Sequence, residues 1–205
     1  MTTSPPGTRI HVSASAARAI DTAIDDAVER ASFETVTKAP PKSAQAQMRF
    51  LTKTEKGSTK AVAARLGVSR RTVERYLAGQ HKTPRAALRE ALGREVAGSW
   101  QPRVRQRARK RAATTAGLAI ETRATFGYEA PAGTTDEARE RLIRVDLPAT
   151  YANRIFTAQR GESSQELRDI IAEGLAEVYF RDGGRRAQGL DVVLTDIDYI
   201  DMRFK

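Results

Sequence analysis

One short segment combines basic and hydroxyl side chains at a spacing suited to contact with nucleic acid. Lys60 to Leu77 reads KAVAARLGVSRRTVERYL, the pattern of two short helices joined at Gly67, a helix-turn-helix. The first turns of the second helix would enter a major groove and reach base edges or phosphates. The side chains that we expect there are Ser69, Arg70, Arg71, Thr72 and Arg75. The alternative is a three-helix scaffold whose arginines are only solvated.

A second basic segment lies between Trp100 and Ala113. It holds six cations and no acidic residue, namely Arg103, Arg105, Arg107, Arg109, Lys110 and Arg111. A run of one sign can follow a phosphate backbone, so we expect this segment to contact nucleic acid. The alternative is a solvated linker helix. Trp100 itself could stack on an unpaired base or cap a hydrophobic core.

The charge of the whole chain is divided in the same way. The net charge is +10 and the isoelectric point is near 10.3. Residues 1–115 hold 23 Lys and Arg against 9 Asp and Glu, whereas residues 116–205 hold 12 against 16. We expect the basic half to bind an anionic partner and the acidic half to have another role.

Other kinds of chemistry find little support in the sequence. There is no cysteine, and His11 and His81 are far apart, so we expect no metal site and no resident cofactor. Asp196, Asp198 and Asp201 could bind Mg²⁺ if the fold brought them together, but they fit better as the solvated side of a strand. No apolar run approaches the roughly 20 residues that span a membrane, and no secretion signal is evident. The expected location is cytoplasmic and associated with the nucleoid.

Four segments are predicted to position these residues, in a mixed fold. Residues 1–39 read as an N-terminal extension with one amphipathic helix, on which Ile20, Ile24 and Val28 form a stripe. Residues 40–99 read as an all-α helix-turn-helix domain, with a supporting helix from Ser43 to Thr54. Residues 100–115 form the basic linker or helix, and residues 116–205 form a smaller α+β domain.

The apolar positions predict how the helix-turn-helix would pack. Ala61, Ala64 and Leu66 are expected on the inner side of its first helix. Val73 and Leu77, four residues apart, are expected to anchor the second helix.

The α+β domain has its own pattern. Residues 118–128 alternate apolar and polar side chains, as in a strand with one buried face, and residues 142–147 and 190–204 read as further strands. In the last of these the apolar phase changes at Ile200, which predicts a bulge or a break in the strand. Residues 142–180 also resemble the ribbon-helix-helix arrangement, in which two chains pair their strands, and this resemblance would imply a homodimer. An ordinary α+β domain is the alternative.

Together these motifs resemble one family, the telomere terminal proteins (Tpg) that cap linear chromosomes and plasmids of actinomycetes. The resemblance covers roughly residues 40–200. The motifs that carry it include Pro41 to Ser43, Arg71 to Tyr76, Trp100 to Pro102, Arg111 to Thr115, Thr122 to Tyr128, Gly133 to Asp136, Ala172 to Leu175 and Val178 to Arg186.

This resemblance implies protein-primed DNA synthesis. In the family, a threonine hydroxyl accepts the first deoxynucleotide and the protein stays attached to the 5′ end of the DNA. The chain would then be an acceptor rather than an enzyme, with Mg²⁺ held by a partner DNA polymerase. The other partners implied are telomeric DNA, as duplex or 3′ overhang, and a telomere-associated DNA-binding protein.

The family motif at Gly133 to Asp136 maps the priming residue to Thr134 or Thr135. Thr134 and Glu137 have the spacing of a capping box, which would engage the Thr134 hydroxyl and leave Thr135 available. We therefore expect Thr135 to be the primer. Without the resemblance, both threonines read as caps.

Other hydroxyls and another function remain open. Thr114 and Thr115 form a rival pair beside the basic segment, and Tyr128 is a further candidate. The alternative function is a helix-turn-helix transcription regulator or partition protein that binds DNA reversibly as a dimer.

Overall fold

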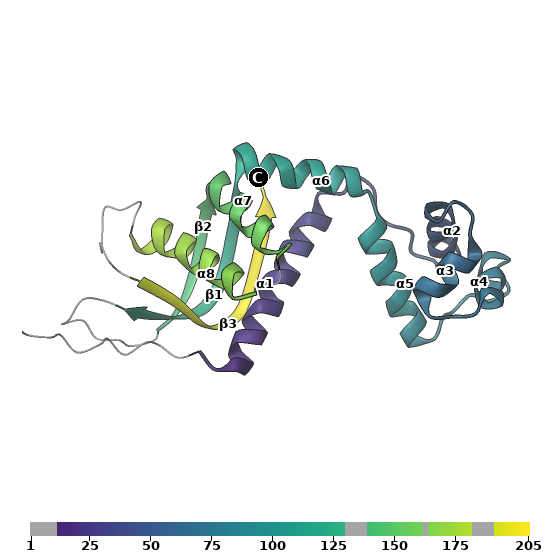
Figure 1. Ribbon diagram of the computed structural model, residues 1–205, viewed down its shortest axis with the longest axis horizontal. Helices are drawn as coiled ribbons and strands as arrows, with labels where there is room; N and C mark the ends of the chain where they lie inside the picture. Colours follow the sequence, from purple (N-terminus) through teal and green to yellow (C-terminus); the bar gives the residue numbers. More distant parts are fainter. Residues whose placement is uncertain (1–11, 130–138, 162–163, 182–190) are drawn as a thin grey trace, which may run out of the picture. The chain divides into compact units, whose positions relative to one another are not determined.

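The computed structural model describes residues 12–129, 139–161, 164–181 and 191–205 of the chain. The chain divides into two compact units (Figure 1). Val36–Arg105 form one, here called the helical unit, and Met1–Thr35 with Gln106–Lys205 form the other, the mixed unit. Each unit has a hydrophobic core of its own.

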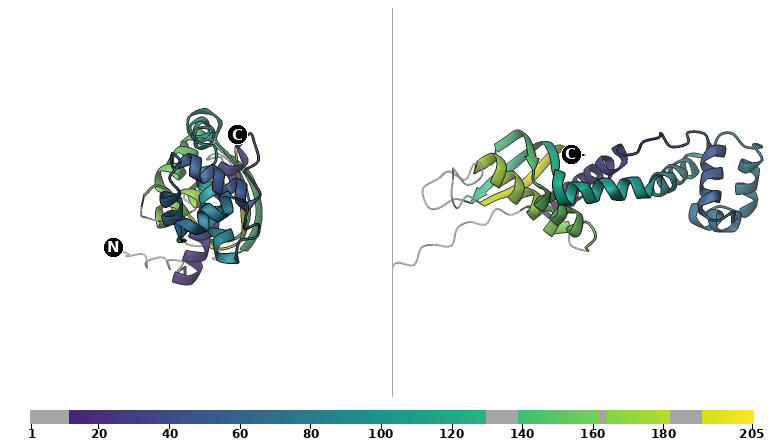
Figure 2. Two further views of the ribbon diagram at one scale, coloured as in Figure 1. Left: turned by 90° about the vertical axis from the view of Figure 1, so that its right-hand side faces the viewer. Right: turned by 90° about the horizontal axis from the view of Figure 1, so that it is seen from above.

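In the helical unit, helices from α2 to α5 contribute to one hydrophobic core (Figure 2). They are α2 (Ala44–Thr54), α3 (Thr59–Leu66), α4 (Arg70–Leu77) and α5 (Ala86–Ser99). Serine hydroxyls cap the first three by accepting a hydrogen bond from a backbone N–H in the first turn. Gly67 has left-handed backbone (φ 65°) and turns the chain sharply between α3 and α4.

The core of the helical unit differs in part from the predicted one. Val62 and Ala63 are buried in α3 beside Leu66, whereas Ala64 is exposed. In α4, Tyr76 is buried with Val73, and Leu77 is only partly buried. In α4, Tyr76 and Leu77 lie three and four residues after Val73, and both spacings fall on one face of a helix, so the sequence pattern alone did not decide between them. In α3, Ala64 and Leu66 are two residues apart and point to different sides, so the predicted inner side was wrong there.

The mixed unit is built on a three-stranded antiparallel sheet of order β2-β1-β3. The strands are β1 (Leu118–Glu129), β2 (Arg139–Leu147) and β3 (Asp191–Phe204). Helices α1 (Ala14–Glu34), α7 (Ala149–Ala158) and α8 (Ser164–Leu175) contribute to its core, together with the π-helical turns η1 (Ala112–Ala116) and η2 (Ala176–Phe180). The expected mixed α+β class is therefore confirmed for the chain.

Strand β1 has the predicted alternation. Every second described residue from Leu118 to Phe126 is buried, and the intervening side chains lie on the other face of the sheet. The register between β1 and β3 shifts at two places, between Arg123 and Ala124 and between Thr125 and Phe126. The predicted irregularity of β3 is thus present, but it lies before Ile200 rather than at it.

The N-terminal helix belongs to the mixed unit, whereas the sequence suggested a separate extension over residues 1–39. Ile20, Ile24 and Val28 are buried in the same core as the sheet. Arg30 donates a hydrogen bond from Nη2 to the backbone oxygen of Ile200 in β3, 2.9 Å away. The amphipathic stripe was recognisable in the sequence, but its partner lies about 170 residues further along the chain.

Strand β2 also differs from the ribbon-helix-helix expectation. Its residues pair with β1 of the same chain from Arg139 to Leu147. In a ribbon-helix-helix protein the corresponding strand pairs with a second chain. The nearby partner strand β1 therefore provides within one chain the hydrogen bonds that such a ribbon obtains from a dimer.

The chain reaches β1 from helix α6 (Pro102–Arg111) and η1 through a tight corner at Gly117. Its φ is 79° and its ψ is −164°, a conformation that only glycine adopts readily. A Cβ atom at this position would lie 2.1 Å from the backbone oxygen of Leu147. Both facts make glycine necessary at the start of the sheet.

Candidate nucleic-acid interface

The arginines of helix α4 are exposed because its apolar residues pack into the core on the other side of the helix. Val73 and Tyr76 face inward, and Arg70, Arg71 and Arg75 are exposed. The phenolic O–H of Tyr76 also lies 3.4 Å from the backbone oxygen of Thr83, which follows α4. The three arginines thus project from one side of a helix whose other side is fixed.

The two hydroxyl residues predicted for this interface have local structural contacts. Ser69 accepts a hydrogen bond from the backbone N–H of Thr72 at 3.1 Å, and their hydroxyl oxygens lie 2.8 Å apart. Ser69 therefore caps α4, and the cationic side chains are the main exposed groups of this helix.

One residue that supports α4 was missed by sequence reasoning. The side-chain Nε2 of Gln45, in α2, donates a hydrogen bond to the backbone oxygen of Leu77 at 3.0 Å. A Cβ on Gly79 would lie 3.1 Å from the same nitrogen. Through its hydrogen bond to Leu77, Gln45 satisfies a carbonyl at the C-terminal end of α4. Nothing in the local sequence pattern distinguishes this glutamine from a solvated one.

A second missed residue ties the helices of this unit together. Arg65 of α3 pairs with Glu55 at 2.6 Å and with Glu95 of α5, and it lies 3.2 Å from the hydroxyl of Ser99. Hydrogen bonds to the two carboxylates raise the pKa of Arg65. This arginine therefore stabilises the helical unit by ion pairs, and it neutralises two acidic residues of the unit.

The boundary between the units also divides the charge. Residues 36–105 include 16 Lys and Arg against 4 Asp and Glu, and the rest of the chain holds 19 against 21. This division is sharper than the one between the two halves of the sequence. The excess of positive charge therefore belongs to the helical unit, where it would attract a polyanion.

The six cations of the basic segment separate into two groups. Arg105 donates a hydrogen bond to the backbone oxygen of Ala97 at 3.0 Å, and Arg109 lies 2.8 Å from carboxylate oxygen Oε1 of Glu29. Arg109 also contacts Gln159 and the ring of Phe156. The exposed members are Arg103, Arg107, Lys110 and Arg111, which share one face of α6.

The candidate priming threonines, Thr134 and Thr135, lie outside the described residues, as does the side chain of Tyr128. Their rivals Thr114 and Thr115 are exposed in η1, where their hydroxyls donate to the backbone oxygens of residues 110 and 111 at 2.9 and 3.2 Å.

Trp100 and His81 have contacts within the helical unit. Trp100 donates a hydrogen bond from Nε1 to the backbone oxygen of Lys38 at 2.7 Å and packs edge-on against Phe50. These contacts support a role in packing rather than in stacking on a base. His81 is exposed beside the ring of Tyr76, and His11 lies outside the described residues.

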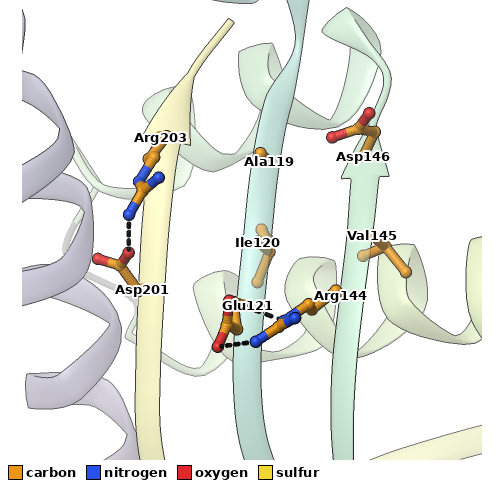
Figure 3. A pocket seen from close by; sticks show the side chains of 8 residues that line it. All are labelled: Ala119, Ile120, Glu121, Arg144, Val145, Asp146, Asp201 and Arg203. Atoms are coloured by element: carbon orange, nitrogen blue, oxygen red, sulfur yellow. Dashed lines mark hydrogen bonds and ion pairs between the residues drawn. The ribbon is translucent and has the colours of Figure 1, made fainter.

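A pocket of about 340 Å³ lies on the face of the sheet opposite the helices (Figure 3). Its charged lining consists of Glu121, Asp146, Asp201, Arg144 and Arg203, and each of these side chains has an ion-pair partner. Glu121 contacts Arg144 at 2.9 Å and accepts a hydrogen bond from Tyr199, and these two contacts lower the pKa of Glu121. Asp201 lies 3.5 Å from Arg203. With three carboxylates and two guanidinium groups in its lining, the pocket has no excess attraction for an anion.

The carboxylates of β3 stay apart from one another. Asp196 accepts a hydrogen bond from the backbone N–H of Ile197, and Asp198 lies 3.9 Å from Arg123. Among the described residues, no group of three or more His, Cys, Asp and Glu could hold a metal ion. The exposed arginines of the helical unit are therefore the better candidate site.

Comparison with protein-family models, with curated proteins and with solved structures found no match. Within the described segments, no helix is long and apolar enough to cross a membrane.

Proposed function

We propose that the helical unit is a helix-turn-helix DNA-binding domain and that the chain is a terminal protein of a linear replicon. The observation that carries the first part is the arginine-rich exposed side of α4 on a strongly basic unit. The second part rests on the resemblance to the telomere terminal proteins. The protein would act at the nucleoid, on telomeric duplex or its 3′ overhang.

The DNA-binding step follows from ordinary recognition chemistry. Arg70, Arg71 and Arg75 can donate to guanine O6 and N7 or to phosphates when α4 enters a major groove. The exposed cations of α6 can neutralise further phosphates. Each neutralised phosphate contributes about 0.9 to the slope of log affinity against log salt for duplex DNA.

In the proposed priming step, the hydroxyl of Thr135 acts as the nucleophile. Its oxygen attacks the α-phosphorus of the first deoxynucleotide and forms a new O–P bond. The bond from the α-phosphorus to the oxygen that bridges to the β-phosphate breaks, and pyrophosphate leaves with that electron pair. The hydroxyl proton passes to a base or to water in the polymerase site. Threonine is a weak nucleophile, so the Mg²⁺ ions of the partner polymerase would activate it.

The partners proposed are those that such a step requires. A DNA polymerase supplies catalysis, a telomere-associated DNA-binding protein recruits the complex, and this chain is the acceptor. A homodimer is compatible with DNA binding through a helix-turn-helix.

Deoxynucleotidylation tests the proposal. Full-length protein is incubated with host extract, telomeric 3′-end template and labelled deoxynucleotides, and the labelled peptide is mapped by mass spectrometry. We expect label on Thr135, and Thr135→Ala should lose the label while it keeps duplex binding. Thr134→Ala and Thr115→Ala serve as matched hydroxyl controls.

Label on another residue would keep the priming role and correct its site. Absence of label from every variant, with duplex binding intact, would favour the reversible regulator or partition protein.

A further inference from the structure

The arginine-rich side of α4 carries one acidic residue, Glu74. Its Oε1 lies 2.7 Å from Nε of Arg70, one helical turn earlier. The side chains of Arg70 and Glu74 are 68% and 46% exposed, so this pair lies on the surface that would face DNA.

Helix stability gives little reason for this pair. A cation in the first turn opposes the helix dipole, and arginine before glutamate is the less favourable order for an ion pair along a helix. The carboxylate also reduces attraction to phosphates in a unit that otherwise concentrates positive charge. A role in orienting Arg70 accounts for both features.

The geometry suits that role. The contact between Arg70 and Glu74 engages Nε, on the side of the guanidinium group. The two Nη groups at its end have the spacing that meets O6 and N7 of guanine together. Holding the side chain beforehand reduces the conformational entropy that binding would cost. Arg71 and Arg75 show no such carboxylate partner among the described residues.

We propose that Glu74 is a positioning residue that orients Arg70 to read a guanine in the major groove. This inference rests on the proposed DNA binding and adds the kind of base recognised and the residue that sets it. Arg75 lacks this support in the part of the chain that the structure describes, so we expect it to contact phosphate without a base preference.

The test uses the full-length protein and a set of duplexes. A preferred duplex is first selected from a randomised pool with the wild-type chain. Affinities of wild type, Glu74→Gln, Arg70→Lys and Arg75→Gln are then measured for that duplex, for each single base-pair change and for unrelated duplex, over a range of salt concentrations.

We expect Glu74→Gln to lose about 10-fold in discrimination at one G·C pair, and Arg70→Lys to lose it at the same pair. Because Glu74→Gln removes a negative charge, it should bind unrelated duplex more tightly than wild type does. Arg75→Gln should instead weaken all duplexes alike and lower the salt slope by about 0.9. All of these side chains are exposed, so thermal unfolding should confirm that each variant stays folded.

The inference is overturned if Glu74→Gln binds every duplex more tightly and keeps the wild-type base preferences, because the carboxylate would then act only through its charge. In that case the proposed DNA binding stands. If the wild-type chain binds no duplex at all, the proposed function fails and this inference fails with it.

Discussion

At the scale of single residues, the basic side chains divide into those that hold the fold and those available to a partner. Arg107 and Arg109 are two positions apart in α6 and look equivalent in the sequence. Arg109 contacts Glu29, Gln159 and the ring of Phe156, whereas Arg107 is exposed. The difference arises from the side of the helix on which each one lies.

Replacing Arg109 by alanine should therefore reduce stability, whereas replacing Arg107 by alanine should reduce duplex affinity. Arg109→Ala should lower the free energy of unfolding by about 1–3 kcal/mol, because its ion pair, hydrogen bond and ring contact are lost. Arg107→Ala should leave stability within about 0.5 kcal/mol but reduce duplex affinity and the salt slope. Urea unfolding and duplex titration measure the two effects, and equal stability losses would contradict the division.

Tyr151 is the other residue whose surroundings make a measurable prediction. Its hydroxyl contacts the carboxylates of Glu177 and Glu173, the latter at 3.2 Å. Burial, followed by these acidic neighbours, raises the pKa of Tyr151 above its ordinary value of 10.0. The folded protein therefore holds the phenol proton more tightly than the unfolded chain does.

Stability from Tyr151 should be present below about pH 10 and should decline as pH rises beyond that value, where the unfolded chain loses the proton first. The difference in unfolding free energy between wild type and Tyr151→Phe should thus shrink between pH 9 and about pH 11. Urea unfolding at several pH values measures it. Tyr179→Phe, at an exposed side chain, is the matched control for the removal of a phenol hydroxyl. A constant difference would show that Tyr151 does not cause the decline.

At the scale of elements, α4 is short, so its stability depends on how its ends are satisfied. Its eight residues run from Arg70 to Leu77, and Ser69 caps the first turn. Gln45 satisfies the backbone oxygen at residue 77. Short helices are marginal by themselves, so these end contacts help to keep the arginines in place.

Ser69→Ala should destabilise the helical unit by about 1 kcal/mol, because the cap is lost. Ser69→Asp should keep that stability, since aspartate also caps and its charge suits the helix N-terminus. Its negative charge should nevertheless weaken duplex binding. Thermal unfolding and duplex titration separate these effects, and a fully stable Ser69→Ala protein would show that the cap is unimportant.

At the scale of the whole molecule, the two hydrophobic cores share no residue among those described. Val73 is fully buried in the core of the helical unit, and Ile155 in that of the mixed unit. The chain has a single tryptophan, Trp100, which lies in the helical unit. Its fluorescence can therefore follow one unit alone.

Val73→Ala should lower the urea midpoint of Trp100 fluorescence, with a loss of about 2 kcal/mol from the helical unit. Ile155→Ala should cost the mixed unit about 3 kcal/mol and leave that midpoint unchanged. Circular dichroism would show the second transition. If Ile155→Ala shifts the fluorescence midpoint by the same amount, the two units unfold as one.

The sequence by itself determined the features that depend on near neighbours. Gly67 was recognisable as the corner between two helices, residues 43–54 as a supporting helix and β1 as an alternating strand, because each depends on residues within one or two turns. The same local pattern predicted the exposed arginines of α4 and the mixed α+β class.

Only the tertiary structure decided which distant surfaces cover the apolar faces and which polar groups they engage. It placed α1 in the core of the mixed unit, gave Arg109 the partner Glu29, 80 residues away, and joined Gln45 to the end of α4. Periodicity shows that a helix has an apolar side, but it carries no information about the chain segment that packs there. That choice depends on shape and hydrogen bonding between residues remote in sequence.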